Sequence, residues 1–135
     1  MFIITIFIFF LVAADASVLS DAEWTAAINR KLCENGTHSD PVAADFFACY
    51  DEEITPGGGQ FVRCQLEVFG VLINTEENVD SVCAQGDKFP QYSDCIILGL
   101  IGIGVNPAVA VHLLNVCQGA VLDVPEPPPR LISTK

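Results

Sequence analysis

Six cysteines constrain the fold of this chain more than any other feature. They are Cys33, Cys49, Cys64, Cys83, Cys95 and Cys117. At least eleven residues separate each cysteine from the next, whereas structural zinc sites use cysteines only about two to four residues apart. We therefore expect neither a metal nor a cofactor. In an oxidising compartment an even set predicts three disulfides, and the spacing leaves all fifteen pairings open.

The start of the chain indicates such a compartment. Residues 2–14 are apolar except for Thr5, which suits the hydrophobic region of a secretory signal peptide. Ala14 and Ala16 place small side chains at the two positions that signal peptidase reads, so we expect cleavage after Ala16. An uncleaved membrane anchor is less favoured because a spanning helix needs about 20 apolar residues. The sequence thus predicts a secreted, extracellular protein that loses residues 1–16.

Capping residues and glycine or proline stops divide the rest of the chain into short helices. The candidate N-caps are Ser20, Ser39, Thr75, Ser93 and Asn106. The expected helices cover about residues 21–33, 40–53, 61–73, 76–85, 93–105 and 107–118. Residues 61–73 also alternate as a strand would, and we choose helix because no partner strand is evident.

Each expected helix carries one cysteine, so the predicted fold is all-α. It is a compact, disulfide-stapled bundle of about five to six short helices over residues 17–122. Gly57–Gly59 is predicted to be a flexible connector, and Gly119 a helix stop. Residues 123–135 are rich in proline and are expected to form an extended or disordered tail.

Charge and motifs exclude several functions. Seventeen acidic residues against six basic ones give a formal net charge of −11, which leaves no basic surface for nucleic acid or for an anionic membrane. The acidic clusters at 51–53 and 76–77 are expected to face solvent. No nucleophile motif accompanies His38 or His112, so we predict that the protein is not an enzyme.

Residues 96–105 form the most unusual stretch, because they are apolar on every side of a helix. Such a helix is either central to the core or in contact with lipid, and we favour the core. Gly99 and Gly102 would allow a second helix to approach closely, or would leave space for an apolar ligand.

In size, acidity, number of helices and number of cysteines, the chain resembles the insect odorant-binding proteins. Their second and third cysteines are four residues apart and their fifth and sixth are nine apart. Here the corresponding pairs are Cys49 with Cys64 and Cys95 with Cys117, which are much more widely spaced. The resemblance therefore concerns architecture alone, and it carries over neither a disulfide pairing nor pocket residues.

The leading functional hypothesis is a secreted, non-enzymatic protein that binds or carries a small apolar ligand. The residues expected to line its pocket are Phe61, Val68, Leu72, Leu100, Ile103, Val109, His112 and Leu113. If His112 faces that pocket, ligand binding should depend on pH. Asn35 begins an Asn-Gly-Thr sequon and is a candidate glycosylation site.

The alternative is a secreted interaction protein, such as a venom, glandular or host-directed effector. Its target would be a basic protein or a membrane. A solid core with an exposed apolar patch would favour interaction, whereas an internal cavity would favour ligand carriage.

Overall fold

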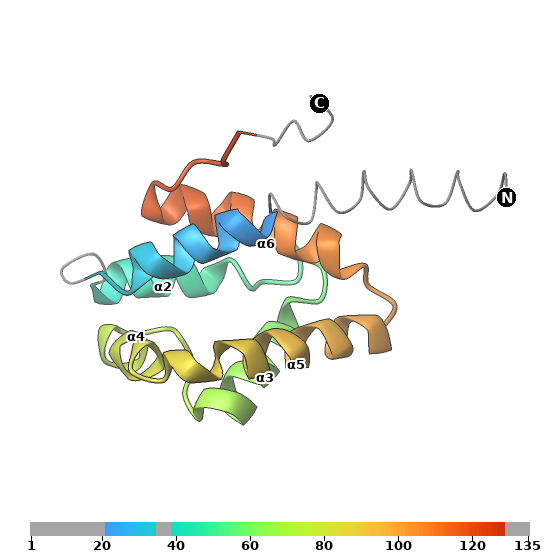
Figure 1. Ribbon diagram of the computed structural model, residues 1–135, viewed down its shortest axis with the longest axis horizontal. Helices are drawn as coiled ribbons and strands as arrows, with labels where there is room; N and C mark the ends of the chain where they lie inside the picture. Colours follow the sequence, from blue (N-terminus) through green and yellow to red (C-terminus); the bar gives the residue numbers. More distant parts are fainter. Residues whose placement is uncertain (1–20, 35–38, 129–135) are drawn as a thin grey trace, which may run out of the picture.

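The computed structural model of the protein describes residues 21–34 and 39–128. Within these ranges the chain forms α-helices and one short 3-10 helix, with no β-strand (Figure 1). Residues 21–32 are helical, and the elements that follow are α2 (Asp40–Ala48), α3 (Gly58–Phe69), α4 (Glu76–Cys83), η1 (Gly86–Lys88), α5 (Phe89–Gly102) and α6 (Pro107–Leu122). The predicted all-α fold is confirmed, as is a helix rather than a strand in α3. The predicted signal peptide, the Ser20 cap, the Asn35 sequon, His38 and residues 129–135 lie outside the described residues.

The helices form two layers (Figure 1). The helix over 21–32 lies with α2 and α6 in one layer, and α3, α4 and α5 form the other. The main packing within the layers is α2 on α6 and α3 on α5, while α5 against α6 and α2 against α4 join the layers.

The disulfides follow this arrangement. Cys49–Cys117 fastens α2 to α6, and Cys64–Cys95 fastens α3 to α5, so each lies within one layer. Cys33–Cys83 connects the end of the first helix to α4 and therefore links the two layers. The expected stapling of helix to helix is confirmed, and every cysteine is paired.

Three of the predicted N-caps are confirmed. The side chains of Ser39, Thr75 and Asn106 accept hydrogen bonds from backbone N–H groups in the first turns of α2, α4 and α6. The cap predicted at Ser93 is wrong, because α5 begins earlier, at Phe89, with Pro90 in its first turn. Proline suits that position since the N–H it lacks would have no helical partner there.

The predicted stop at Gly119 is also wrong. Helix α6 continues to Leu122 and ends where Asp123 adopts the left-handed conformation, with φ 60°. The Val124 N–H then donates to the Gly119 carbonyl at 2.7 Å and closes the helix end. Gly119 has a different role: a Cβ there would lie 2.7 Å from the Val124 carbonyl oxygen and 3.1 Å from Trp24 Nε1. The glycine allows these groups to approach α6.

The segment Gly57–Gly59 is a tightly packed helix start, and the prediction of a flexible connector is wrong. Gly57 has φ 76°, and a Cβ on Gly58 would lie 1.8 Å from the Tyr50 carbonyl oxygen. The Glu52 carboxylate accepts hydrogen bonds from the Gly57 and Gly59 N–H groups, at 3.0 and 2.7 Å. The acidic cluster at 51–53 is exposed as expected, and Glu52 in addition caps α3.

The apolar stretch over residues 96–105 is only half buried, so the expectation of a core helix buried all round is wrong. Ile96 and Leu100 lie in the core, but Leu98 and Ile101 are 70% and 59% exposed. The helix itself stops at Gly102. Gly99 does permit close packing, because Gln60 and Arg63 of α3 lie against its Cα, whereas a Cβ on Gly102 would meet open space.

Candidate functional site

The residues predicted to line a pocket lie in different environments. Three are core residues: Phe61, Val68 and Leu100. Three are exposed: Ile103, Val109 and Leu113. Leu72 and His112 are half-buried. The structure therefore does not gather the eight around one described cavity.

His112 belongs to a polar contact between the first helix and α6. Its Nδ1 lies 3.1 Å from the Asp21 carboxylate, and its ring meets that of Trp24 edge-on, with centroids 5.9 Å apart. Buried Asn115, one α-helical turn away, donates to Thr25 Oγ1 at 2.9 Å and to the Asp21 carbonyl oxygen. These bonds satisfy polar groups at the helix contact, so their evident role is to hold the first helix on α6.

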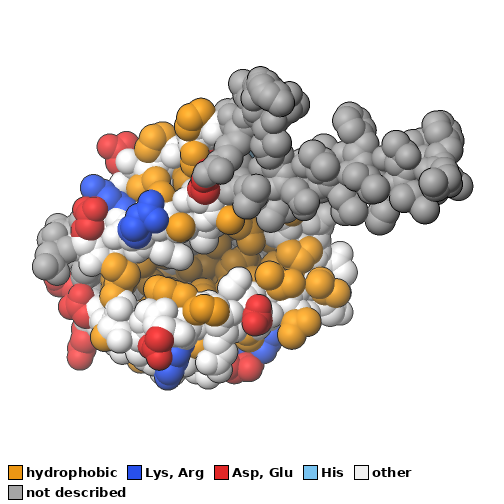
Figure 2. Space-filling view, viewed as in Figure 1, with side chains coloured by type: hydrophobic (Ala, Val, Ile, Leu, Met, Phe, Trp, Pro, Cys, Tyr) orange, Lys and Arg blue, Asp and Glu red, His pale blue; other side chains and the backbone are white. Residues whose placement is uncertain are grey.

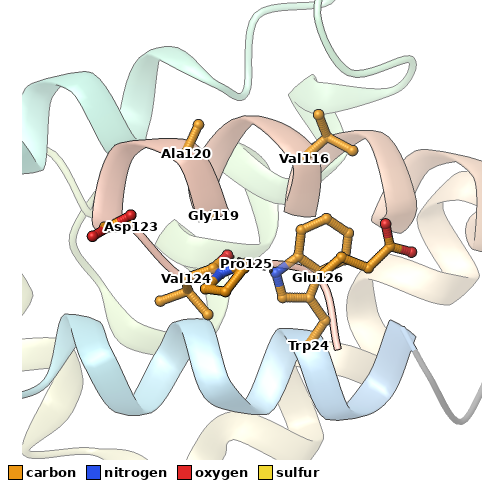
Figure 3. Close-up of a pocket in the computed structure, with 8 residues that line it drawn as sticks. All are labelled: Trp24, Val116, Gly119, Ala120, Asp123, Val124, Pro125 and Glu126. Atoms are coloured by element: carbon orange, nitrogen blue, oxygen red, sulfur yellow. Dashed lines mark hydrogen bonds between the residues drawn. The ribbon is translucent and has the colours of Figure 1, made fainter. Parts of the chain in front are cut away.

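A shallow groove of about 340 Å³ lies beside this contact (Figure 3). Its lining comes from the first helix, the end of α6 and the segment that follows: Trp24, Val116, Gly119, Ala120, Asp123, Val124, Pro125 and Glu126. Trp24 Nε1 donates to the Val124 carbonyl oxygen at 3.0 Å, which fixes the outgoing chain against the first helix. None of the predicted pocket residues lines this groove, which is open to solvent.

A buried polar cluster lies where the layers meet. Gln65 on α3 accepts from the Ile73 N–H at 3.0 Å and donates to the Tyr92 hydroxyl at 3.0 Å. Gln118 on α6 donates to the Phe46 carbonyl oxygen and also contacts the Tyr50 hydroxyl. Burial raises the pKa of Tyr50, although its hydrogen bonds with Gln118, Tyr92 and Gln65 oppose the shift.

Tyr92 has its pKa raised further, mainly by burial and then by the charge that an ionised Tyr50 would carry. Both phenols are therefore neutral at physiological pH. Their hydroxyls take part in the hydrogen bonds of this cluster.

The most exposed apolar surface lies at the end of α5 and around its connection to α6. We call it the apolar tip and define it as Ile97, Leu98, Ile101, Ile103 and Val109, which are 40–70% exposed. Figure 2 shows hydrophobic side chains gathered at the end of the molecule where α5 finishes. Leu113 and Val116 extend the apolar surface along α6 at helical spacing.

The apolar tip lies within a long segment that carries no formal charge. Residues 95–122 contain no Lys, Arg, Asp or Glu, and His112 is their one other ionisable group apart from the paired cysteines. This absence of charge is the sequence signal that could have indicated the site. The pattern could not show which side of α5 faces outward, so Leu98 and Ile101, its most exposed residues, were missed as site residues.

Among the described residues, no single helix is long and apolar enough to cross a membrane. The segments Gly86–Gly102 and Pro107–Leu122 reach that length and composition together, but they are bent by 120° at the break between them. Within the described ranges no three His, Cys, Asp or Glu side chains gather as a metal site would need.

The face shown in Figure 2 is hollowed between the two layers, and hydrophobic side chains line the hollow. The groove of Figure 3, this hollow and the apolar tip are thus the surface features that a ligand or partner could use.

Fold and disulfides define a small disulfide-stapled helical bundle, a construction typical of extracellular proteins. No protein-family model, curated protein or solved structure matches the chain.

Proposed function

We propose that this is a secreted, non-enzymatic interaction protein that binds its target through the apolar tip. The observation that carries the proposal is the distribution of exposed apolar side chains. Of the nine large hydrophobic residues exposed in the described ranges, seven lie on α5, on α6 or between them. Soluble proteins expose such groups singly, and a concentration of them is typical of an interaction surface.

The disulfides support the same proposal. Cys95 and Cys117 anchor the two helices that carry the tip, and each bonds to a fully buried cysteine, Cys64 or Cys49. An apolar surface held on a rigid frame binds with a smaller entropic cost than a flexible one. It also stays exposed instead of collapsing into the core.

A second candidate function, the carriage of a small apolar ligand, is favoured by the hollow between the layers in Figure 2. Hydrophobic walls suit an apolar molecule. However, Phe61, Val68 and Leu100 lie in the core, which argues for less internal space for a ligand than the sequence predicted.

One titration separates the two functions. Nile red, a neutral apolar dye, is added to the protein as a secretory host releases it, and to its Leu98→Asp variant. Leu98 is 70% exposed, so the substitution should leave the fold intact, as circular dichroism would check. If the tip is the binding surface, dye fluorescence falls severalfold in the variant. Saturable binding of one dye per chain that Leu98→Asp leaves unchanged would instead support carriage and contradict the proposal.

A further inference from the structure

We infer that the apolar tip docks on the surface of an electrically neutral phospholipid bilayer. The inference rests on the proposed function and names its target. It starts from three observations about the same surface: its chemistry, its lack of charge and its position at a corner of the chain.

The chemistry of the tip suits hydrocarbon. Its exposed side chains are branched aliphatic ones from isoleucine, leucine and valine. Protein interfaces are instead enriched in aromatic and arginine side chains, which are absent from the described residues 97–109. Aliphatic side chains can enter the boundary between lipid headgroups and acyl chains without a partner surface of complementary shape.

Charge selects a neutral surface. The chain has a formal net charge of −11, so an anionic membrane would repel it as a whole. Acidic residues stop at Asp94 and resume at Asp123, and residues 95–122 contain no Lys, Arg, Asp or Glu that would resist entry into the interface. A protein target with basic groups would instead bind to the acidic parts of the surface. The tip has no acidic residue, so it does not suit such a target.

Geometry places these residues at a turn. The segments Gly86–Gly102 and Pro107–Leu122 have the composition of a membrane span only when taken together, and they are bent by 120° between Gly102 and Pro107. Such a corner can enter one leaflet with its apex while both helices return to the protein. Asn106, which caps α6 by accepting from the Ala108 and Val109 N–H groups, satisfies backbone donors there.

The chain offers a matched control at Leu66. Leu66 is 51% exposed on α3, similar to the residues of the tip. Helix α3 runs antiparallel to α5, since Gln60 lies against Gly99, Cys64 bonds to Cys95 and Gln65 bonds to Tyr92. Leu66 is therefore level with the first half of α5, several residues from the tip.

The test is flotation of the secreted protein with phosphatidylcholine vesicles. The wild type should float with the vesicles, and replacing part of the phosphatidylcholine with phosphatidylserine should weaken binding severalfold at low salt. Leu98→Asp should reduce partitioning about tenfold or more, because it places a charge where the acyl boundary would be. Leu98→Ser should reduce it less, and Leu66→Asp should change it less than about twofold. Failure to bind neutral vesicles, or equal losses in Leu98→Asp and Leu66→Asp, would overturn the inference.

The dye titration keeps this outcome separate from the proposed function. If the protein does not bind vesicles but binds Nile red through Leu98, the apolar tip is an interaction surface for a different partner. A second copy of the chain is that occupant if native mass spectrometry shows a dimer that Leu98→Asp abolishes. A protein that binds neither vesicles nor dye through the tip contradicts both proposals.

Discussion

Trp24 and Val124 are a hundred residues apart in sequence, and the indole Nε1 of Trp24 donates a hydrogen bond to the Val124 carbonyl oxygen at 3.0 Å. This bond joins the first described helix to the segment that leaves α6 (Figure 3). It satisfies the one polar atom of the side chain of a residue that is only 5% exposed. The two ends of the described chain are thereby held on the same layer.

The Trp24→Phe substitution should remove this bond while keeping an aromatic ring in place. We expect the free energy of unfolding to fall by about 1–2 kcal/mol, from the lost hydrogen bond and the smaller ring. Amide hydrogen exchange of Val124 should accelerate, whereas that of buried Val79 on α4 should not change in the folded state. Unchanged exchange at Val124 would show that the bond does not hold the segment.

Gly119→Ala should destabilise the protein even though alanine favours helices over glycine by about 1 kcal/mol. The added Cβ would meet the Val124 carbonyl oxygen and the Trp24 indole. Gly102→Ala is the matched control, since it is also a helical glycine but has nothing within 4 Å of the added Cβ. In urea unfolding, the free energy of unfolding should therefore fall in Gly119→Ala and rise in Gly102→Ala. A gain of stability in Gly119→Ala would contradict the close packing of Val124 and Trp24 against Gly119.

Local signals in the sequence predicted much of this fold. Side-chain caps act within one turn of chain, so Ser39, Thr75 and Asn106 could be assigned without knowledge of tertiary contacts. The same reasoning misassigned Gly119, because a glycine that ends a helix and one that admits a neighbouring chain are identical in sequence. The identity of that neighbour, Trp24, depends on the folded arrangement.

The candidate site was harder to predict for a related reason. A stretch that is apolar all round does not indicate which face is buried, and the structure buries Ile96 and Leu100 while leaving Leu98 outside. Apolar periodicity, on which the predicted pocket residues rest, describes core residues such as Phe61 equally well. Disulfide pairing likewise depends on which helices meet in space.

Glu52→Ala should destabilise the start of α3. The carboxylate accepts from the Gly57 and Gly59 N–H groups, which would otherwise lack a helical partner, and its loss should cost about 1–2 kcal/mol. Glu53→Ala is the control, because this neighbouring residue has the same charge and is exposed in the turn. Chemical denaturation should give a clearly lower free energy of unfolding for Glu52→Ala than for Glu53→Ala. Equal effects would mean that the acidic cluster acts only through its overall charge.

Alkaline pH should unfold the protein through its tyrosines. The chain has two, Tyr50 and Tyr92, and burial raises the pKa of both above the ordinary value of about 10. Because the folded state favours the neutral phenol, stability from this source is complete below that value and is lost as pH rises beyond it. Tyrosinate absorbance should therefore appear late and together with loss of helical circular dichroism.

The reduced, denatured chain is the reference for this titration, and its tyrosines should ionise near the ordinary pKa. If one of the two tyrosines ionises near the ordinary pKa while the helices persist, its phenol is accessible in the folded protein. Tyr92 is the residue to examine in that case, because as a whole residue it is less buried than Tyr50, which is 6% exposed.

Mild reduction should open the disulfides in a fixed order. Cys33 and Cys83 are both half-buried, whereas each of the other two disulfides joins a fully buried cysteine, Cys49 or Cys64, to a half-buried one, Cys117 or Cys95. A thiolate can attack either sulfur of a disulfide, and Cys33–Cys83 alone has both residues partly exposed, so this bond should be reduced first. Alkylation followed by mass spectrometry should then find an intermediate labelled at these two cysteines alone.

That intermediate should keep its helices, because each layer retains its own disulfide, but it should lose the covalent link between the layers. From the chain-entropy model its free energy of unfolding should be lower by about 2–5 kcal/mol. The Cys33→Ala/Cys83→Ala variant provides the same species without reductant, and denaturation should report the same loss. In denaturant the order of reduction should disappear. First labelling of Cys64 or Cys49 under mild conditions would contradict the burial on which the order depends.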